Sequence, residues 1–330
     1  MTLSLNSLVG TIGSLLAKAV EPIFVALQRL LGIKRLPWVF LLPNLAAVVL
    51  FSLLPVFINV YYSISGSDRL YPTERPVIGL DNFEALARCQ NFLDPSTCSQ
   101  DLFWRALQNT VVFVPVQVVL MVLVSLLTAV VLNRDIRARG FFRGVFFFPV
   151  MLSPVVVALV WKWILQREGI LNAAFNGMGL QSVEWLVRPD SAFSWAIAVT
   201  VWANMGFYTL ILLAGLQAIP RDVYEAAKMD SASPWRQFTR ITLPLLRPTM
   251  LVVVVLAVIR SVQTFDELYV LTGGGPGSAT TLIIQYIYER GFAAQPRNFG
   301  LAAAASLVVG LVLLVLTILQ MRLSRKSYNG

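Results

Sequence analysis

The stretch Thr110–Leu132 reads TVVFVPVQVVLMVLVSLLTAVVL and contains no charged residue. At 1.5 Å per residue, a helix of this length crosses the roughly 30 Å of hydrocarbon in a lipid bilayer. The runs at 193–216 and 299–321 are equally free of charge. Three such segments in one water-soluble fold are very improbable, so the stretch predicts a transmembrane helix in a membrane protein.

The composition extends this prediction to the whole chain of 330 residues. Hydrophobic residues make up 57% of the chain and charged residues only 13%, whereas a soluble domain rarely exceeds about half apolar. The apolar residues cluster in six runs, at about 38–64, 110–132, 144–164, 193–216, 250–271 and 299–321. The sequence therefore predicts an all-α polytopic membrane protein with six transmembrane helices.

The placement of Lys and Arg predicts how these spans are oriented. Sixteen of these cations precede the first span or lie in the second-to-third connection, the fourth-to-fifth connection and the tail, against eight in the alternate connections. Loops that stay in the cytoplasm carry an excess of Lys and Arg, so we expect both termini to be cytoplasmic. This placement also explains the net charge of +9, and no nucleic-acid partner is expected.

The first 36 residues leave two interpretations open. The segment 1–36 is apolar but contains Lys18, Glu21 and Pro22. Its leucines recur at roughly helical spacing, which favours an amphipathic helix in the membrane interface. A seventh span over about 3–31 is the alternative.

The reactive side chains exclude several kinds of chemistry. The two cysteines, Cys89 and Cys98, fall in the first non-cytoplasmic loop, where an oxidising compartment would permit a disulfide. Two free thiols are the equal alternative. Without histidine there is no Ser-His-Asp triad and little for a zinc or iron site. No Gly-Lys pair exists to build a phosphate-binding G-x-x-x-x-G-K loop. We therefore expect a transport subunit with no cofactor of its own, driven by an ion gradient or a partner.

The fourth-to-fifth connection, residues 219–247, is long for a helix–helix connection. Pro220 suits the first turn of a helix, and Ser233 can cap a second helix that has Pro234 at its first position. The predicted structure is two short helices with small residues at their bend. Such a hairpin suits docking into a groove on a partner protein; a solvated amphipathic linker is the alternative.

This connection resembles the EAA loop of binding-protein-dependent ABC importer permeases, through Glu225-Ala226-Ala227, then Ser231, Ile241 and Leu243-Pro244. The resemblance implies a hairpin that docks into a cleft of the ATPase subunit and transmits its closure to the spans. The residues to which it assigns this coupling are Glu225, Ala226, Ala227, Asp230, Ser231, Ala232, Ile241, Leu243 and Pro244. The family usually has glycine where this chain has Ser231, and glycine adopts a left-handed backbone more easily, so the turn geometry is in question.

Four further motifs resemble the carbohydrate branch of these permeases, of the maltose and glycerol-phosphate type, from about residue 38 to the C-terminus. They are Gly79–Phe83, Asn109-Thr110, Phe148-Pro149 and Leu271–Pro276. The resemblance implies a type I ABC importer permease of the bacterial inner membrane, with its permease domain at 37–325 and a tail at 326–330. It further implies a sugar or sugar-like solute, a second homologous permease, two ATPase subunits that bind ATP and Mg, and a periplasmic or extracellular solute-binding protein. A gradient-driven secondary transporter and a non-transporting scaffold are the alternatives.

Polar side chains within the spans predict where the solute passes, because such groups are costly in a bilayer. In the fifth run, four polar residues stand at relative positions zero, three, four and seven, which lie on one face of a helix. This spacing predicts one polar stripe that faces a central cavity. The residues are Arg260, Gln263, Thr264 and Glu267, with Asp266 beside them, and Trp202, Asn204 and Tyr208 in the fourth run. The alternative is an Arg260–Glu267 pair that packs helices together, with the aromatic residues at the membrane interface. Gly273–Gly277 is expected to form a flexible turn that touches the binding protein, or else an ordinary Gly-Pro turn.

Overall fold

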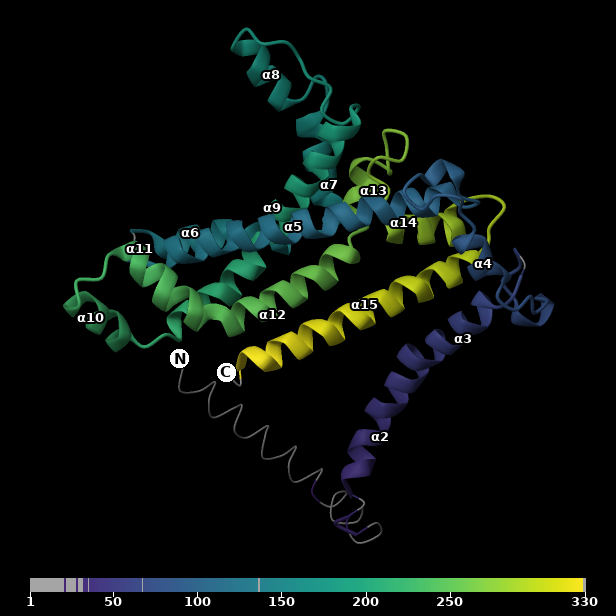
Figure 1. Cartoon of the computed structure of the whole chain (residues 1–330), viewed down its shortest axis with the longest axis horizontal. Helices are drawn as coiled ribbons and strands as arrows, with labels where there is room; N and C mark the ends of the chain where they lie inside the picture. Colours follow the sequence, from purple (N-terminus) through teal and green to yellow (C-terminus); the bar gives the residue numbers. More distant parts are fainter. Residues whose placement is uncertain are drawn as a thin grey trace. The chain divides into compact units, whose positions relative to one another are not determined.

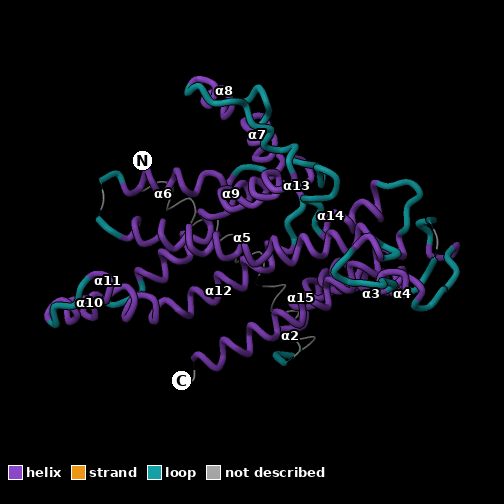
Figure 2. The backbone as a smooth tube through the Cα atoms, turned by 45° about the horizontal axis from the view of Figure 1, so that its top comes forward, coloured by secondary structure: helices purple, strands orange, loops and turns teal. Residues whose placement is uncertain are grey.

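The computed structural model describes residues 36–66, 68–135 and 137–328, together with Glu21, Gln28 and residues 32–34. Within these residues every regular element is a helix, and Figure 2 shows helices joined by loops. The chain divides into two compact units, 1–61 and 62–330. The alternatives for the segment 1–36 concern residues that lie almost entirely outside the described part of the chain.

The first unit contains the first predicted span. Here α2 (Leu36–Val48) continues through the π-helical turn η1 (Val49–Leu53) into α3 (Leu54–Ser63). Pro55 has no N–H to give the preceding turn, and a widened turn accommodates this loss. The helix Phe40–Ser63 is 24 residues long, and no residue of its most apolar window is buried within the chain. Its apolar side chains are therefore left for lipid or a partner protein.

The second unit carries the remaining helices, many of which Figure 1 labels. They are α4 (Asp81–Ala87), α5 (Asp101–Asn133), α6 (Arg139–Phe147), α7 (Pro154–Leu165), α8 (Ile170–Gly177), α9 (Pro189–Gln217), α10 (Arg221–Met229), α11 (Pro234–Gln237), α12 (Leu243–Val262), α13 (Asp266–Leu271), α14 (Ile283–Tyr288) and α15 (Phe299–Tyr328). Shorter turns lie between them, η2 (Pro72–Glu74), η3 (Pro95–Thr97), η4 (Phe148–Met151), η5 (Phe238–Thr242) and η6 (Glu289–Ala293). Within the described residues five helices are long and apolar enough to span a membrane, or six if one bent pair counts as a span. The all-helical polytopic fold is confirmed.

The third predicted run, 144–164, is not one straight helix. The helical segment Arg139–Met151 and the segment Pro154–Gly177 meet at an angle of 101°. Pro154 begins α7, and the residue before it, Ser153, is extended with ψ 136°. A residue before proline is pushed out of the helical region by the proline ring. The run was apolar enough for a span, but its two prolines, Pro149 and Pro154, break it.

The main core of the second unit lies between α5, α9 and α12. Figure 1 shows α5 and α12 as long neighbouring helices. The core takes Phe113 and Leu126 from α5, Leu212 from α9, and Leu246 and Val253 from α12. Small residues let these helices approach closely, as is usual inside a membrane. At Gly206 of α9 an added Cβ would lie 2.3 Å from the Phe146 carbonyl oxygen. Glycine has no Cβ, so the backbone of α9 can approach the end of α6 this closely.

The connection between α4 and α5 is closed by an internal cross-link. A disulfide joins Cys89 to Cys98, with their Cα atoms 4.0 Å apart. Within the loop it closes, the Ser96 amide and hydroxyl both donate to the Asp94 carboxylate. These hydrogen bonds hold the pKa of Asp94 below its ordinary value.

The Gly273–Gly277 turn is hydrogen-bonded to the residues after it, which favours the ordinary Gly-Pro turn of the two alternatives. The Thr280 amide donates to the Gly274 carbonyl oxygen at 3.1 Å, and the Thr280 hydroxyl donates to that of Gly275 at 2.8 Å. The Asn109 amide donates to the carbonyl oxygens of Ser278 at 2.8 Å and Thr281 at 3.0 Å. Gly274 has φ +87°, and a Cβ there would lie 2.5 Å from the side-chain amide of Gln285. The end of α5 and the glycine turn are therefore built into one packed structure.

Candidate functional site

A helical hairpin between α9 and α12 is the first candidate site. As predicted, α10 is a short helix, and Ser233 caps the next helix by accepting a hydrogen bond from the Arg236 amide. The second helix is not a separate short one, however, because α11 continues through η5 into α12 as a single helix, Pro234–Val262. Pro234 stands at its first position. The Tyr224 hydroxyl lies 3.0 Å from the Thr242 hydroxyl and joins α10 to η5. The hairpin is thus a structured unit rather than a solvated linker.

The turn of the hairpin is a Schellman motif, in which a left-handed residue ends a helix. The Ala232 amide donates to the Ala227 carbonyl oxygen at 2.9 Å, and the Ser231 amide donates to that of Lys228 at 3.0 Å. Ser231 has φ +53°, so serine adopts the left-handed backbone that glycine would adopt more easily. The turn geometry therefore survives the departure from glycine.

Ser231→Gly is expected to stabilise the protein by about 1 kcal/mol, because the left-handed backbone costs a residue with a Cβ roughly 1–2 kcal/mol and glycine's freedom in the unfolded chain offsets part of the gain. Thermal unfolding of the detergent-purified protein measures this. Ala232→Gly is the matched control, and it should destabilise the protein because Ala232 is not left-handed. A lower melting temperature for Ser231→Gly would contradict the prediction.

The hairpin exposes four of the nine predicted coupling residues. Glu225, Ala226, Asp230 and Ser231 are exposed. Ala227 is only 7% exposed, so it packs inside the hairpin. Ala232, Ile241, Leu243 and Pro244 are half-buried. Beside the acidic residues, Met229 and Trp235 are 86% and 73% exposed, which leaves large apolar side chains for a partner to cover.

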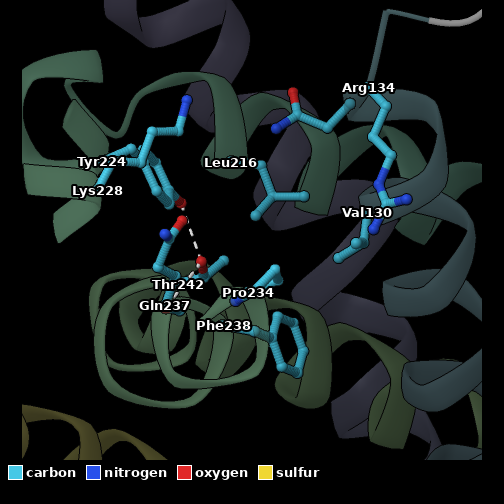
Figure 3. A pocket seen from close by; sticks show the side chains of 10 residues that line it. Val130, Arg134, Leu216, Tyr224, Lys228, Pro234, Gln237, Phe238 and Thr242 are labelled. Atoms are coloured by element: carbon cyan, nitrogen blue, oxygen red, sulfur yellow. Dashed lines mark hydrogen bonds between the residues drawn. The ribbon is translucent and has the colours of Figure 1, made fainter. Parts of the chain in front are cut away.

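A pocket of about 460 Å³ separates the hairpin from the ends of α5 and α9. Figure 3 shows Val130 and Arg134 on one side of it and Tyr224 and Lys228 on the other. Leu216 lies between them. The hollow lies beside the contact between the hairpin and the spans, where Tyr224 and Phe238 pack against the main core.

A cavity between α9 and α12, with both polar and apolar lining, is the second candidate site. It has a volume of about 360 Å³, and its polar lining residues are Asn204, Tyr208, Arg260 and Gln263. Val150 of η4 and Phe207 of α9 form part of its apolar wall. The rings of Phe207 and Tyr208 lie 5.3 Å apart, edge to face. Four of the predicted path residues, from two separate runs, thus meet at one cavity.

The polar stripe expected in the fifth run is wrong as a continuous helical face. The helix α12 ends at Val262, and residues 263–265 are not helical. The Thr264 hydroxyl donates to the Arg260 carbonyl oxygen at 3.2 Å, so this side chain provides a hydrogen bond to a carbonyl group in the last turn of α12. A new helix, α13, then begins with Asp266 and Glu267, and acidic residues are favoured in the first turn of a helix. Arg260 consequently lies in the last turn of α12 rather than mid-helix.

The other predicted path residues lie outside the cavity lining. Trp202 packs against Trp161 with their rings 5.5 Å apart, and both belong to the apolar cluster of α7, α9 and α13. Thr264 and Glu267 are buried, and Asp266 is exposed on α13. Among the described residues no ion pair joins Arg260 to Glu267, because the pairs found are Arg69–Glu74, Arg105–Asp101, Arg139–Asp135 and Arg167–Glu184.

The structure adds Gln117 of α5, which the sequence prediction missed. Gln117 is 3% exposed and accepts a hydrogen bond from the Ser261 hydroxyl of α12. It lines a small hollow together with Asn204, Tyr208 and Arg260. The signal was present, since a glutamine inside an uncharged span is as unusual as the polar residues of the fifth run.

Comparison with known proteins places these features in a family. The family model described as the binding-protein-dependent transport system inner membrane component matches residues 121–327. The trehalose/maltose transport system permease protein MalF of Thermococcus litoralis is 34% identical over 295 residues, which cover 88% of this chain and 94% of that protein. The lactose transport system permease protein LacF of Rhizobium radiobacter is 33% identical over 294 residues, covering 88% and 94%.

Solved structures show the same fold at lower identity. A bacterial ABC transporter involved in the import of the acidic polysaccharide alginate has a chain that matches with a TM-score of 0.74 at 24% identity. The match covers 91% of this chain and 99% of that one. A second structure, of a bacterial alginate ABC transporter in complex with an alginate pentasaccharide-bound periplasmic protein, matches with a TM-score of 0.73 at 23% identity, covering 91% and 97%.

Proposed function

The chain belongs to the family of inner membrane components of binding-protein-dependent transport systems, as a multi-pass permease subunit of an ABC importer, and we propose that its solute is a saccharide. The observation that carries the proposal is the cavity that Asn204, Tyr208 and Gln263 line with neutral polar groups beside the ring of Phe207. A sugar ring has apolar C–H faces and hydroxyl edges, which match aromatic faces and amides. Relatives named for trehalose, maltose, lactose and arabino-oligosaccharides support this class.

The hairpin of α10 and α11 is the proposed contact with the ATPase. Its exposed Glu225 and Ala226, with Asp230 and Ser231 at the bend, would seat in a cleft of that subunit. The buried Ala227 would act by holding the helix against the turn. Movement would pass to α9 and α12, because both helices continue directly from the hairpin.

Alternating access is the proposed mechanism, with rigid movement of packed helices around the cavity. ATP and Mg would bind at two ATPase subunits, whose closure draws the hairpins together and turns the cavity from one face of the membrane to the other. A second, homologous permease would supply the other half of the path. A solute-binding protein would deliver the saccharide from the opposite side.

The proposed orientation places the hairpin and both termini in the cytoplasm. The hairpin connection carries Arg221, Lys228, Arg236, Arg240 and Arg247, in agreement with the excess of cations on cytoplasmic loops. The permease domain is proposed to extend over 37–325, with the segment 1–36 before it and the tail 326–330 after it.

Uptake of radiolabelled saccharides into proteoliposomes tests the proposal. The vesicles would hold the complete complex, with ATP inside and the solute-binding protein outside. ATP-dependent accumulation of a saccharide is the expected result. Uptake that needs an ion gradient and no ATP would replace the proposal with secondary transport.

Gln263→Ala tests the cavity itself. Because Gln263 is exposed to the cavity and neutral, losing its hydrogen bonds to the solute should cost about 0.5–1.5 kcal/mol each, roughly a two- to tenfold change in the uptake KM or rate. Gln181→Ala, on an exposed loop outside the cavity lining, is the matched control and should transport like the unmodified protein. Unchanged kinetics and specificity for Gln263→Ala would remove this residue from the path.

A further inference from the structure

The cavity between α9 and α12 contains a charged group that neutral saccharides do not require. Arg260 is the charged member of its lining, and the other polar members, Asn204, Tyr208 and Gln263, are neutral. The side chain is exposed and also lines the smaller hollow beside Gln117. A guanidinium carries five N–H donors and stays protonated, so the cavity has a fixed positive charge.

Nothing in the described part of the chain neutralises that charge. Its ion pairs involve other arginines, and the contact found at Arg260 uses its carbonyl oxygen, which accepts from Thr264. The acids nearest in sequence, Asp266 and Glu267, line neither hollow. The position of Arg260 in the last turn of α12 suits a cation at the negative end of the helix dipole. The dipole explains why a cation is tolerated there, but it leaves the donors without partners.

A charged group at the end of a membrane-spanning helix is costly unless it is hydrated or paired. A neutral sugar would offer hydroxyl groups, and the charge would stay uncompensated. A carboxylate or a phosphate ester offers two oxygens that match the planar fork of a guanidinium. The same solute could place its ring against Phe207 and its hydroxyls on Asn204 and Gln263.

We infer that the solute bears an oxyanion group, either the carboxylate of an acidic sugar or a phosphate ester, and that Arg260 binds that group in the cavity. This inference rests on the proposed function, since it adds the charge of the solute to the proposed saccharide class. It assigns Arg260 the role of a specificity-determining residue. The neutral residues of the lining then recognise the sugar ring.

The first experiment is calorimetry of the cognate solute-binding protein with three probes. These are digalacturonate for the carboxylate, glucose 6-phosphate for the phosphate ester, and maltose for a neutral sugar. Tight binding of one of the anionic probes, with weaker binding of maltose, is the expected result and tells the two oxyanions apart. Binding of maltose alone would overturn the inference while leaving the proposed saccharide transport intact.

The second experiment assigns the selectivity to Arg260, through ATP-driven uptake by the complete complex in proteoliposomes. Arg260→Gln should raise the KM for the anionic probe at least tenfold, since a hydrogen bond to a charged group is among the stronger ones. Arg260→Lys keeps the charge but loses the planar fork, so it should recover only part of the anionic uptake. Arg297→Gln removes an exposed cation of a loop outside the cavity and should behave like the unmodified protein.

Two outcomes of the uptake experiment would overturn the inference. One is equal loss of anionic and neutral uptake in Arg260→Gln, which would make Arg260 a packing residue or the partner of an acid from the sister permease. The other is unchanged anionic uptake in Arg260→Gln. The proposed function itself would fail only if no saccharide of any class accumulated with ATP.

Discussion

Ala226→Trp is expected to reduce stimulated ATP hydrolysis and uptake by the complete complex at least about tenfold. Ala226 is exposed on α10, so a larger side chain there leaves the fold of this chain undisturbed. In the proposed docked state the same position lies against the ATPase. Forcing a large side chain into a packed interface costs about 1–3 kcal/mol or more, and about 1.4 kcal/mol corresponds to a factor of ten.

Two controls separate docking from folding in this experiment. Ala226→Ser keeps the small volume and should retain activity. Ala87→Trp places the same bulk on an exposed alanine at the end of α4, away from the hairpin, and should leave ATP hydrolysis unchanged. All three variants should insert into the membrane and melt at similar temperatures. Full stimulated turnover in Ala226→Trp would show that the hairpin does not couple the complex to ATP.

Gly206→Ala is expected to destabilise the protein by about 3 kcal/mol, at the upper end of the usual range for overpacking. The added Cβ would lie 2.3 Å from the Phe146 carbonyl oxygen and 2.9 Å from the Phe147 Cα. Both neighbours are backbone atoms, so the end of α6 must move away from α9. That movement would shift Val150 and Phe207, which form part of the cavity wall, and saccharide uptake should fall with stability.

Thermal unfolding of the detergent-purified complex measures this effect, and a drop of several degrees is expected for Gly206→Ala. Gly310→Ala is the matched control, because nothing lies within 4 Å of a Cβ built there. In the middle of α15 alanine should be neutral or stabilising, since it favours a helix over glycine. Equal melting temperatures for Gly206→Ala and the unmodified protein would mean that α6 and α9 do not pack closely in the membrane.

The assignment to an importer family changes which alternatives remain. A secondary transporter and a scaffold were compatible with six apolar runs alone. The family match over residues 121–327 includes the hairpin, and it favours an ATP-driven importer over both.

The candidate sites differ in how far the sequence predicted them. The starts of the two hairpin helices, the cap at Ser233 and the bend between them were predicted, because they depend on neighbours in the chain. The burial of Ala227 and the continuation of the second helix into α12 were not predicted. The cavity was predicted only in part. Asn204 and Tyr208 were found by their polarity within a span, whereas Gln117 was missed and Trp202 proved to pack on Trp161. Polarity shows that a residue is unusual in a membrane, but it does not show which side of the helix bundle it faces.

The sequence by itself determined the helical membrane fold, the positions of the apolar runs that form α5, α9 and α15, and the bend of the hairpin. These depend on the hydrophobic effect over about 20 consecutive residues and on helix capping. Both effects involve residues that are close to one another along the chain. The tertiary structure decided the break between Val262 and Asp266 and the burial of Ala227. It also decided the hydrogen bond from Asn109 to the segment after the glycine turn, and the cavity that Arg260 and Asn204 line together. Each of these depends on hydrogen bonds or contacts between residues whose spatial relation appears only when the helices pack.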